Sequence, residues 1–187
     1  MILSDRTIKE KIKGGAIVIE PFSEEFLQPA SYDLHLDKYF LVFNKESIGM
    51  IDVKNKQENL MREIVVDKEE GFIIHPGEFI LANIEETTGV DAKHVGRLEG
   101  KSSLGRLGLI IHATAGFLDP GNKLKMTLEL ANVSSIPIKI YPGMKIAQIA
   151  FEEMDTESER PYGSKGLDSK YYGDKKVEAS KMWKNFK

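Results

Sequence analysis

The run GLIIHATAGFLDPGNKLKMTLELANV, residues 108–133, holds the pattern that decides the fold class. Two stretches with the composition of strands, 108–113 and 125–133, flank a glycine-containing segment with a turn-forming Asp-Pro-Gly at 119–121. In the second stretch, apolar side chains alternate with small and polar ones, as in a strand with one buried face. A strand, a turn and a strand in so short a space indicate an all-β domain.

The same pattern extends outward along most of the chain. Further β-rich runs alternate with turns that include Pro-Gly at 76–77 and 142–143. We expect strands at 16–20, 31–36, 39–43, 63–66, 71–74, 78–84, 94–100, 136–140 and 145–154. One short helix is expected at 5–13, capped by Ser4 and ended by the glycines that follow it. The pattern predicts an all-β sandwich, barrel or jelly roll with few helices.

The length of 187 residues suits one domain with an appended tail. We assign 1–162 to the β domain and 163–187 to a lysine-rich C-terminal tail. On composition alone the tail is expected to be disordered or solvated, and the alternative is that it folds over an anionic group. The segment 44–69 is charged and weakly patterned, which predicts an exposed hairpin or insertion.

Composition excludes several classes of protein. The net charge of -3 provides no strong field for nucleic acid, and no aromatic-basic stripe is visible. The chain has no cysteine, which excludes disulfides, a thiolate nucleophile and Cys-ligated zinc. No apolar run is long enough to span a bilayer, and the first residues lack a signal-peptide core. We expect a cytoplasmic protein without membrane or nucleic-acid partners.

Two places have side chains suited to chemistry. Lys101, Ser102, Ser103 and Arg106 offer cations, hydroxyls and backbone N–H groups that suit phosphate oxygens, although a solvated polar turn has the same composition. Glu129 falls on one strand face between small residues, where a partly enclosed carboxylate can act as a general base. A salt-bridged glutamate on a solvated face is the alternative.

Two other features are ambiguous or negative. Asp119, read alone, is explained by turn chemistry. The histidines show no metal-ligand spacing and are expected to pack or lie on the surface. They are His35, His75, His94 and His112.

Seven segments, taken in order, carry a resemblance to a known family. They are MILSD (1–5), QPASYDLHL (28–36), GKSSLGRLGL (100–109), HATAGFLDPG (112–121), TLELAN (127–132), PGMKIAQIAF (142–151) and RPYGSKGLDSKY (160–171). Together they resemble the dCTP deaminases of the trimeric dUTPase-like superfamily. The resemblance implies a distorted jelly-roll (β-clip) fold, a homotrimer and active sites at subunit interfaces.

The resemblance also implies an activity: hydrolytic deamination of dCTP to dUTP and ammonia, supplying dUMP for thymidylate synthesis. Glu129 would act as the base, and Ser102 and Arg106 would complete the catalytic group. Mg²⁺ would be held mainly by the triphosphate, without protein ligands of its own and without zinc. The implied substrate-binding residues are Lys101, Ser103, Leu104, Gly105, Asp119, Thr127, Leu128, Gln148, Tyr162 and Lys170.

Smaller features bear on the reaction's extent. Thr-Ala-Gly-Phe at 114–117, through Ala115 and Gly116, resembles members that continue from dUTP to dUMP and pyrophosphate. Lys101 stands where the family usually has arginine, and Asp174 introduces a carboxylate into the tail, which is unfavourable near a triphosphate. The alternatives are a dUTPase of the same fold and a non-catalytic, nucleotide-binding regulatory trimer.

Overall fold

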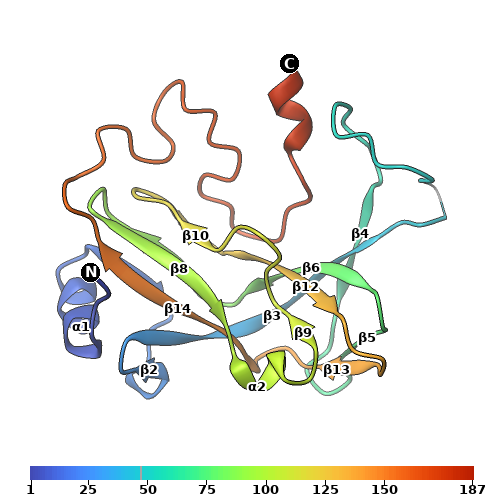
Figure 1. The fold of residues 1–187 in the computed structure, drawn as a ribbon, viewed down its shortest axis with the longest axis horizontal. Coiled ribbons are helices and arrows are strands. Elements are labelled where there is room, and N and C mark those ends of the chain that lie inside the picture. Colours follow the sequence, from blue (N-terminus) through green and yellow to red (C-terminus); the bar gives the residue numbers. More distant parts are fainter. Residues whose placement is uncertain (47) are drawn as a thin grey trace.

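The computed structural model describes residues 1–46 and 48–187 and shows a mostly β protein (Figure 1). The all-β prediction is confirmed. The helices are α1 (Asp5–Lys13), α2 (Ser102–Gly105) and the 3₁₀ turns η1 (Glu24–Phe26) and η2 (Met182–Phe186). The strands are β1 (Ile17–Glu20), β2 (Leu27–Gln28), β3 (Ser31–Phe43), β4 (Met61–Val65), β5 (Phe72–Ile74), β6 (Phe79–Ile84), β7 (Thr87–Val90), β8 (His94–Gly100), β9 (Leu109–Ile110), β10 (Phe117–Leu118), β11 (Lys123–Leu124), β12 (Thr127–Asn132), β13 (Ile138–Ile140) and β14 (Lys145–Glu153).

Strand β3 organises the largest sheet. This sheet runs in the order β10-β8-β14-β3-β6-β12-β9, and β2 and β4 also pair with β3. Smaller sheets, β1-β7-β11 and β13-β5, complete the fold. Tyr32, Leu34, Leu36 and Phe40 on one face of β3 are fully buried. The sheets therefore curl around a single hydrophobic core.

The predicted N-terminal helix is confirmed. The Ser4 hydroxyl accepts a hydrogen bond from the Thr7 amide at 3.5 Å, and Gly14 ends the helix. Ile8 is fully buried, so the apolar face of α1 packs on the core.

The predicted break between strands 31–36 and 39–43 is wrong, because β3 is continuous through Asp37 and Lys38. The Asp37 carboxylate is buried but accepts hydrogen bonds from Lys125 Nζ at 2.9 Å and Asn83 Nδ2 at 3.1 Å. A polar side chain with such partners does not interrupt a strand.

Two further local predictions need correction. The run 102–105 is a short helix rather than an open turn, because its amides bond locally, as from Arg106 N to Ser102 O at 3.0 Å. Of the strand expected at 108–113, only Leu109–Ile110 forms. Beyond it, the amides of Ala113 and Thr114 donate to a carboxylate instead of a neighbouring strand.

The C-terminal tail packs on the β domain, contrary to the expectation from composition. Lys125 N donates to Asp174 O at 2.9 Å, and Gly173 N donates to Asn122 Oδ1 at 3.3 Å. Val177 is 2% exposed. The tail therefore packs against the segment 122–125 and ends in η2, near the top of the view in Figure 1.

Strand β7 was not predicted, whereas the hairpin expected within 44–69 is confirmed, because β4 pairs antiparallel with β3. β7 pairs with β1 and β11, and its Thr-Thr-Gly-Val sequence lacks the alternation that marks a half-buried strand. The segment 44–69 contains β4 and turns, apart from residue 47, which lies outside the described residues. No helix in the described part of the chain is long and apolar enough to cross a membrane.

Candidate active site

A cavity of about 410 Å³ lies beside β12, between the loop 111–119, strand β6 and the tail. Its polar half is formed by β12, the loop and the tail. The polar side chains that line this half include Asp119, Asn122, Thr127, Glu129, Tyr162 and Tyr171. The sequence analysis named four of these six as site residues: Asp119, Thr127, Glu129 and Tyr162. The structure therefore brings these four side chains together in one cavity.

Glu129 is the central carboxylate of this cavity. Its Oε2 accepts hydrogen bonds from the amides of Ala113 at 2.7 Å and Thr114 at 3.2 Å. Its own amide donates to Ile111 O at 3.0 Å. Glu129 therefore fixes the loop that forms one wall, and its carboxylate lies on the loop side of β12.

The opposite wall is apolar. Leu81 on β6 is the register partner of Glu129, so the two side chains emerge next to each other on the same face of the sheet. This face continues over β3 and β4, and residues of the segment 44–60 cover it. We call the set that lines it the apolar annex: Phe43, Ile51, Leu60, Met61, Phe79 and Leu81. Sequence reasoning missed it, because only strand pairing brings these segments beside Glu129.

Asp119 follows β10 and also lines the cavity. Burial raises the pKa of its carboxyl above the ordinary aspartate value. A carboxyl with a raised pKa beside a cavity is a candidate ligand-binding group, in addition to its part in the Asp-Pro-Gly turn.

The tail supplies the lid of the cavity. The Tyr162 hydroxyl accepts a hydrogen bond from Tyr171 N at 3.3 Å, and Tyr171 OH accepts one from Lys181 N at 3.0 Å. Asp174 pairs with Lys181 Nζ at 3.2 Å. This ion pair compensates the carboxylate that looked unfavourable from the sequence.

The second predicted group, Lys101 to Arg106, lies elsewhere. Helix α2 is at the lower end of the view in Figure 1, and none of its residues lines the cavity around Glu129. Gln148 lies near α2, where it donates to Gly100 O at 3.2 Å. Ser102 and Arg106 are exposed, so they are accessible to another molecule.

Lys101 has a structural partner. Its ammonium donates to the buried carboxylate of Asp33, which also pairs with Lys145 Nζ at 3.1 Å. The replacement of the family's usual arginine thus coincides with an ion pair inside the chain.

Three other predicted residues have distinct surroundings. Leu128 is fully buried, on the face of β12 opposite Thr127 and Glu129, so its side chain belongs to the core. Lys170 is partly buried in the tail but does not line the cavity. Ala115 does line it.

Gly116 allows a close backbone approach. A Cβ atom there would lie 2.8 Å from Leu98 O, and Leu98 N donates to Gly116 O at 2.7 Å. Glycine is therefore required to join this loop to β8.

The charge of the cavity is one-sided. Carboxylates from Asp119, Glu129, Asp174 and Glu178 line it, whereas no lysine or arginine among the described residues does. A polyanionic ligand would need cations from outside this lining.

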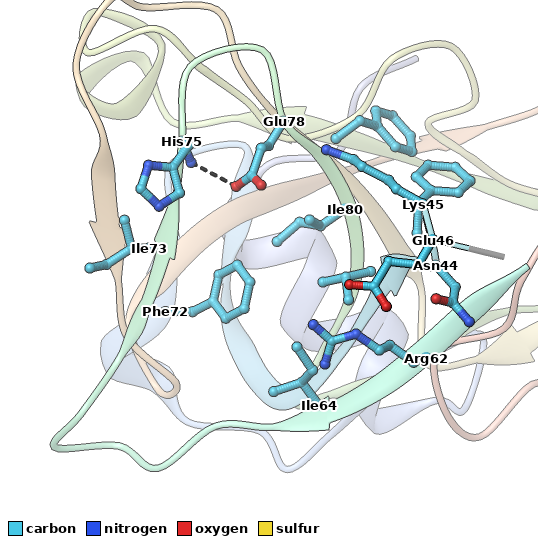
Figure 2. Close-up of a pocket in the computed structure, with 13 residues that line it drawn as sticks. Asn44, Lys45, Glu46, Arg62, Ile64, Phe72, Ile73, His75, Glu78 and Ile80 are labelled. Atoms are coloured by element: carbon cyan, nitrogen blue, oxygen red, sulfur yellow. Dashed lines mark hydrogen bonds between the residues drawn. The ribbon is translucent and has the colours of Figure 1, made fainter. Parts of the chain in front are cut away.

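A separate cavity of about 530 Å³ opens between β4, β5 and β6 (Figure 2). Ile64, Phe72 and Ile80 turn into it, and at its edge His75 N donates to Glu78 Oε2 at 2.8 Å. None of the residues predicted from the sequence as site residues lines it.

Comparisons with known proteins agree with this architecture. A protein called dCTP deaminase, dUMP-forming, from Corynebacterium glutamicum is 50% identical over 186 residues, covering 100% of this chain and 98% of that protein. A protein of the same name from Corynebacterium kroppenstedtii is 49% identical over 187 residues, and the match covers 100% of both chains.

A solved structure shares the fold. The crystal structure of 2'-deoxycytidine 5'-triphosphate deaminase from Agrobacterium tumefaciens matches with a TM-score of 0.62 and 21% identity. The match covers 80% of this chain and 46% of that one. The family model for dCTP deaminase-like proteins matches residues 2–154. With a strand-built cavity around Glu129 and near-50% identity along the whole chain, this protein belongs to the dCTP deaminase family.

Proposed function

We propose that this protein deaminates dCTP and carries the product on to dUMP. The overall reaction is dCTP + 2 H₂O → dUMP + NH₃ + pyrophosphate. The observation that carries the proposal is the position of Glu129 in a cavity between a glycine-containing loop and the tail. The relatives with the printed name dCTP deaminase, dUMP-forming, support the same reaction.

Glu129 is proposed as the general base. It takes a proton from a water molecule, whose oxygen forms a bond to C4 of cytosine. Glu129 then passes protons to N3 and to the departing amino group, and the C4–N bond breaks to release ammonia. Its carboxylate is already oriented by two amides, which lowers the cost of positioning it for this role.

The triphosphate is proposed to bind between two copies of the chain. The cavity around Glu129 offers carboxylates and no cationic lining among the described residues, whereas Ser102 and Arg106 are exposed on α2. The acidic cavity and the exposed surface around Ser102 and Arg106 complement each other. We therefore propose that this surface of a neighbouring subunit binds the triphosphate and stabilises the tetrahedral intermediate. In a closed homotrimer with three such sites, the cavity of every subunit meets the α2 surface of a neighbour.

Other site residues are assigned by position. Asp119 is proposed to bind the deoxyribose 3′-hydroxyl, and Thr127 the cytosine edge. Tyr162 and Lys170 belong to the tail that closes the site. Lys101 is assigned to hold α2 through Asp33 rather than to bind phosphate directly.

Mg²⁺ is proposed to enter with the triphosphate and to neutralise its charge. Among the described residues, no three histidine, aspartate or glutamate side chains cluster closely enough to form a metal site. Protein carboxylates such as Asp119 would at most add a ligand to an ion that the phosphate oxygens already hold.

The test is to incubate the purified protein with dCTP and Mg²⁺ and to measure ammonia and pyrophosphate together. Equal release of both is expected. Ammonia alone would mean that the reaction stops at dUTP. Cleavage of dUTP without deamination would indicate a dUTPase, and tight binding of dCTP without turnover would indicate a regulatory nucleotide-binding protein.

A further inference from the structure

We infer that Lys181 is a positioning residue of the site: it neutralises the carboxylates of the tail, so that the tail can stay docked over a cavity that takes an anionic nucleotide. This inference rests on the proposed function and adds a residue to the same site. It is carried by the contacts that Lys181 makes with three residues of the cavity lining, although Lys181 does not line the cavity itself.

Asp174 makes the tail acidic where it meets the cavity. Its side chain is 12% exposed and lines the cavity. Its carbonyl oxygen accepts a hydrogen bond from Lys125 N at 2.9 Å, and the preceding amide, Gly173 N, donates to Asn122 Oδ1 at 3.3 Å. These bonds fix the backbone against the β domain, so the carboxylate stays at the cavity for as long as the tail is docked.

Lys181 compensates this charge and a second one. Its ammonium donates to Asp174 Oδ1 at 3.2 Å and to Asp174 Oδ2 at 3.4 Å, and it lies 4.0 Å from Glu178 Oε2. Both carboxylates line the cavity. A partly buried carboxylate that loses such a partner is costly to keep buried and repels other anions.

Tyr171 holds Lys181 in this position. The Tyr171 hydroxyl accepts a hydrogen bond from Lys181 N at 3.0 Å, and Lys181 Nζ lies 5.1 Å from the centroid of the Tyr171 ring. A cation over an aromatic ring is attracted to the face of that ring. Tyr171 also lines the cavity, so both the main chain and the side chain of Lys181 are joined to the lid.

The charge balance of the cavity explains why the tail needs this cation. Four carboxylates line the cavity, and no lysine or arginine among the described residues does. Glu129 and Asp119 have proposed tasks at the base and the sugar, whereas the two carboxylates of the tail have none. Closing an uncompensated Asp174 over a triphosphate would weaken binding through like-charge repulsion. Lys181 removes most of this repulsion before the nucleotide arrives.

The first experiment replaces Lys181 by glutamine and measures ammonia release against dCTP concentration. We expect KM to rise at least about tenfold and kcat to change less than about threefold, because the lost partner weakens binding with the tail closed. Lys176→Gln is the matched control: it removes the same charge from an exposed position of the same tail and should leave KM unchanged. A KM for Lys181→Gln within about threefold of wild type would overturn the inference.

A double variant separates charge compensation from packing. Asp174→Asn removes the carboxylate that Lys181 neutralises, so Lys181→Gln combined with Asp174→Asn should return KM to within about threefold of wild type. If KM stays high in the double variant, Lys181 acts through packing alone and its assigned role is wrong.

Hydrogen exchange tests the same contacts without nucleotide. In Lys181→Gln the amides of 171–178 should exchange at least about threefold faster than in wild type, and in Lys176→Gln they should not. Equal exchange in all three proteins would also overturn the inference. A wild-type protein that releases no ammonia would defeat the proposed function, and the exchange rates would still decide whether Lys181 holds the tail.

Discussion

At the scale of the residue, Glu129, the proposed base, also has a structural task. Its Oε2 holds the amides of Ala113 and Thr114, so the carboxylate helps to build the wall of the cavity that it serves. A base held in this way does not have to be ordered during the reaction, which is a general source of catalytic efficiency.

Replacing Glu129 by glutamine separates these tasks. The amide oxygen can still accept from Ala113 and Thr114, so dCTP binding should change little, while ammonia release should fall at least about 100-fold because the base is lost. Steady-state ammonia assays and calorimetric titration with dCTP measure the two effects. Glu78→Gln is the control, since the Glu78 carboxylate also accepts a backbone amide but lies outside this cavity. Turnover of Glu129→Gln within tenfold of wild type would exclude Glu129 as the base.

Asp119 predicts a pH dependence of stability. Because burial raises its pKa in the folded state, its carboxyl stabilises the fold only below the ordinary value of 3.8, and this contribution is lost as pH rises through the folded pKa. Asp119→Asn should therefore raise the free energy of unfolding at pH 7, and Tm with it, by less than about 1 kcal/mol in free energy since the group is partly exposed. The difference should shrink in acid, as thermal unfolding at several pH values would show. A lower Tm for Asp119→Asn at pH 7 would contradict the sign.

At the scale of the element, the loop 111–116 shows why a β-rich composition did not form a strand. Its amides bond to Glu129 and its backbone approaches β8 at Gly116, so no ladder partner is left for it. The resemblance to dUMP-forming relatives gives Gly116 a functional interpretation. The contact with Leu98 O gives it a steric one that holds in any case.

Two glycine-to-alanine changes test whether stability depends on the close backbone contact at Gly116. Gly116→Ala should destabilise the protein by about 1–3 kcal/mol, since its Cβ would lie 2.8 Å from Leu98 O. In Gly105→Ala the new Cβ has no neighbour within 4 Å, and alanine favours the α2 helix, so stability should stay equal or rise by up to about 1 kcal/mol. Thermal denaturation of both variants is the measurement. Equal stability of Gly116→Ala and wild type would show that the loop can move away from β8.

The C-terminal tail shows that a few specific contacts can order a segment whose composition predicts disorder. Lysine-rich sequence predicted disorder, yet Val177 is buried, and Asp174 is bound through both its backbone and its side chain. These contacts bring Tyr162 and Tyr171 over the cavity.

At the scale of the whole molecule, the two predicted groups of site residues are separated within one chain. Glu129 and Asp119 meet in one cavity, while Ser102 begins α2 and Arg106 follows its end, away from the cavity. Under the proposed function, a single chain thus presents two different partial sites. Cyclic assembly is the arrangement in which each partial site meets its complement without leaving one unpaired.

Mixing two inactive variants tests this arrangement. Arg106→Ala alone should lose at least about 100-fold in turnover if the guanidinium stabilises the intermediate. When Glu129→Gln and Arg106→Ala chains are co-assembled in equal amounts, about one quarter of shared sites receive both intact groups, so activity should recover to about that fraction. Ammonia release from the mixed protein measures it. If activity stays at the level of the parent variants, both groups act within one chain.

The sequence by itself determined the β fold class, the capped helix α1 and the residues in its recognisable motifs, because these depend on local alternation, turn chemistry and capping. It did not determine the continuity of β3 or the end of β9, because Asp37 pairs with Lys125 and Glu129 binds the amides of Ala113 and Thr114, which are partners distant in sequence. The short helix α2 was not predicted either, although its amides bond within the run itself. Only the tertiary structure placed Leu81 opposite Glu129 and separated α2 from the cavity. Strand register and chain topology decide such neighbours, and neither is encoded in the spacing of a motif.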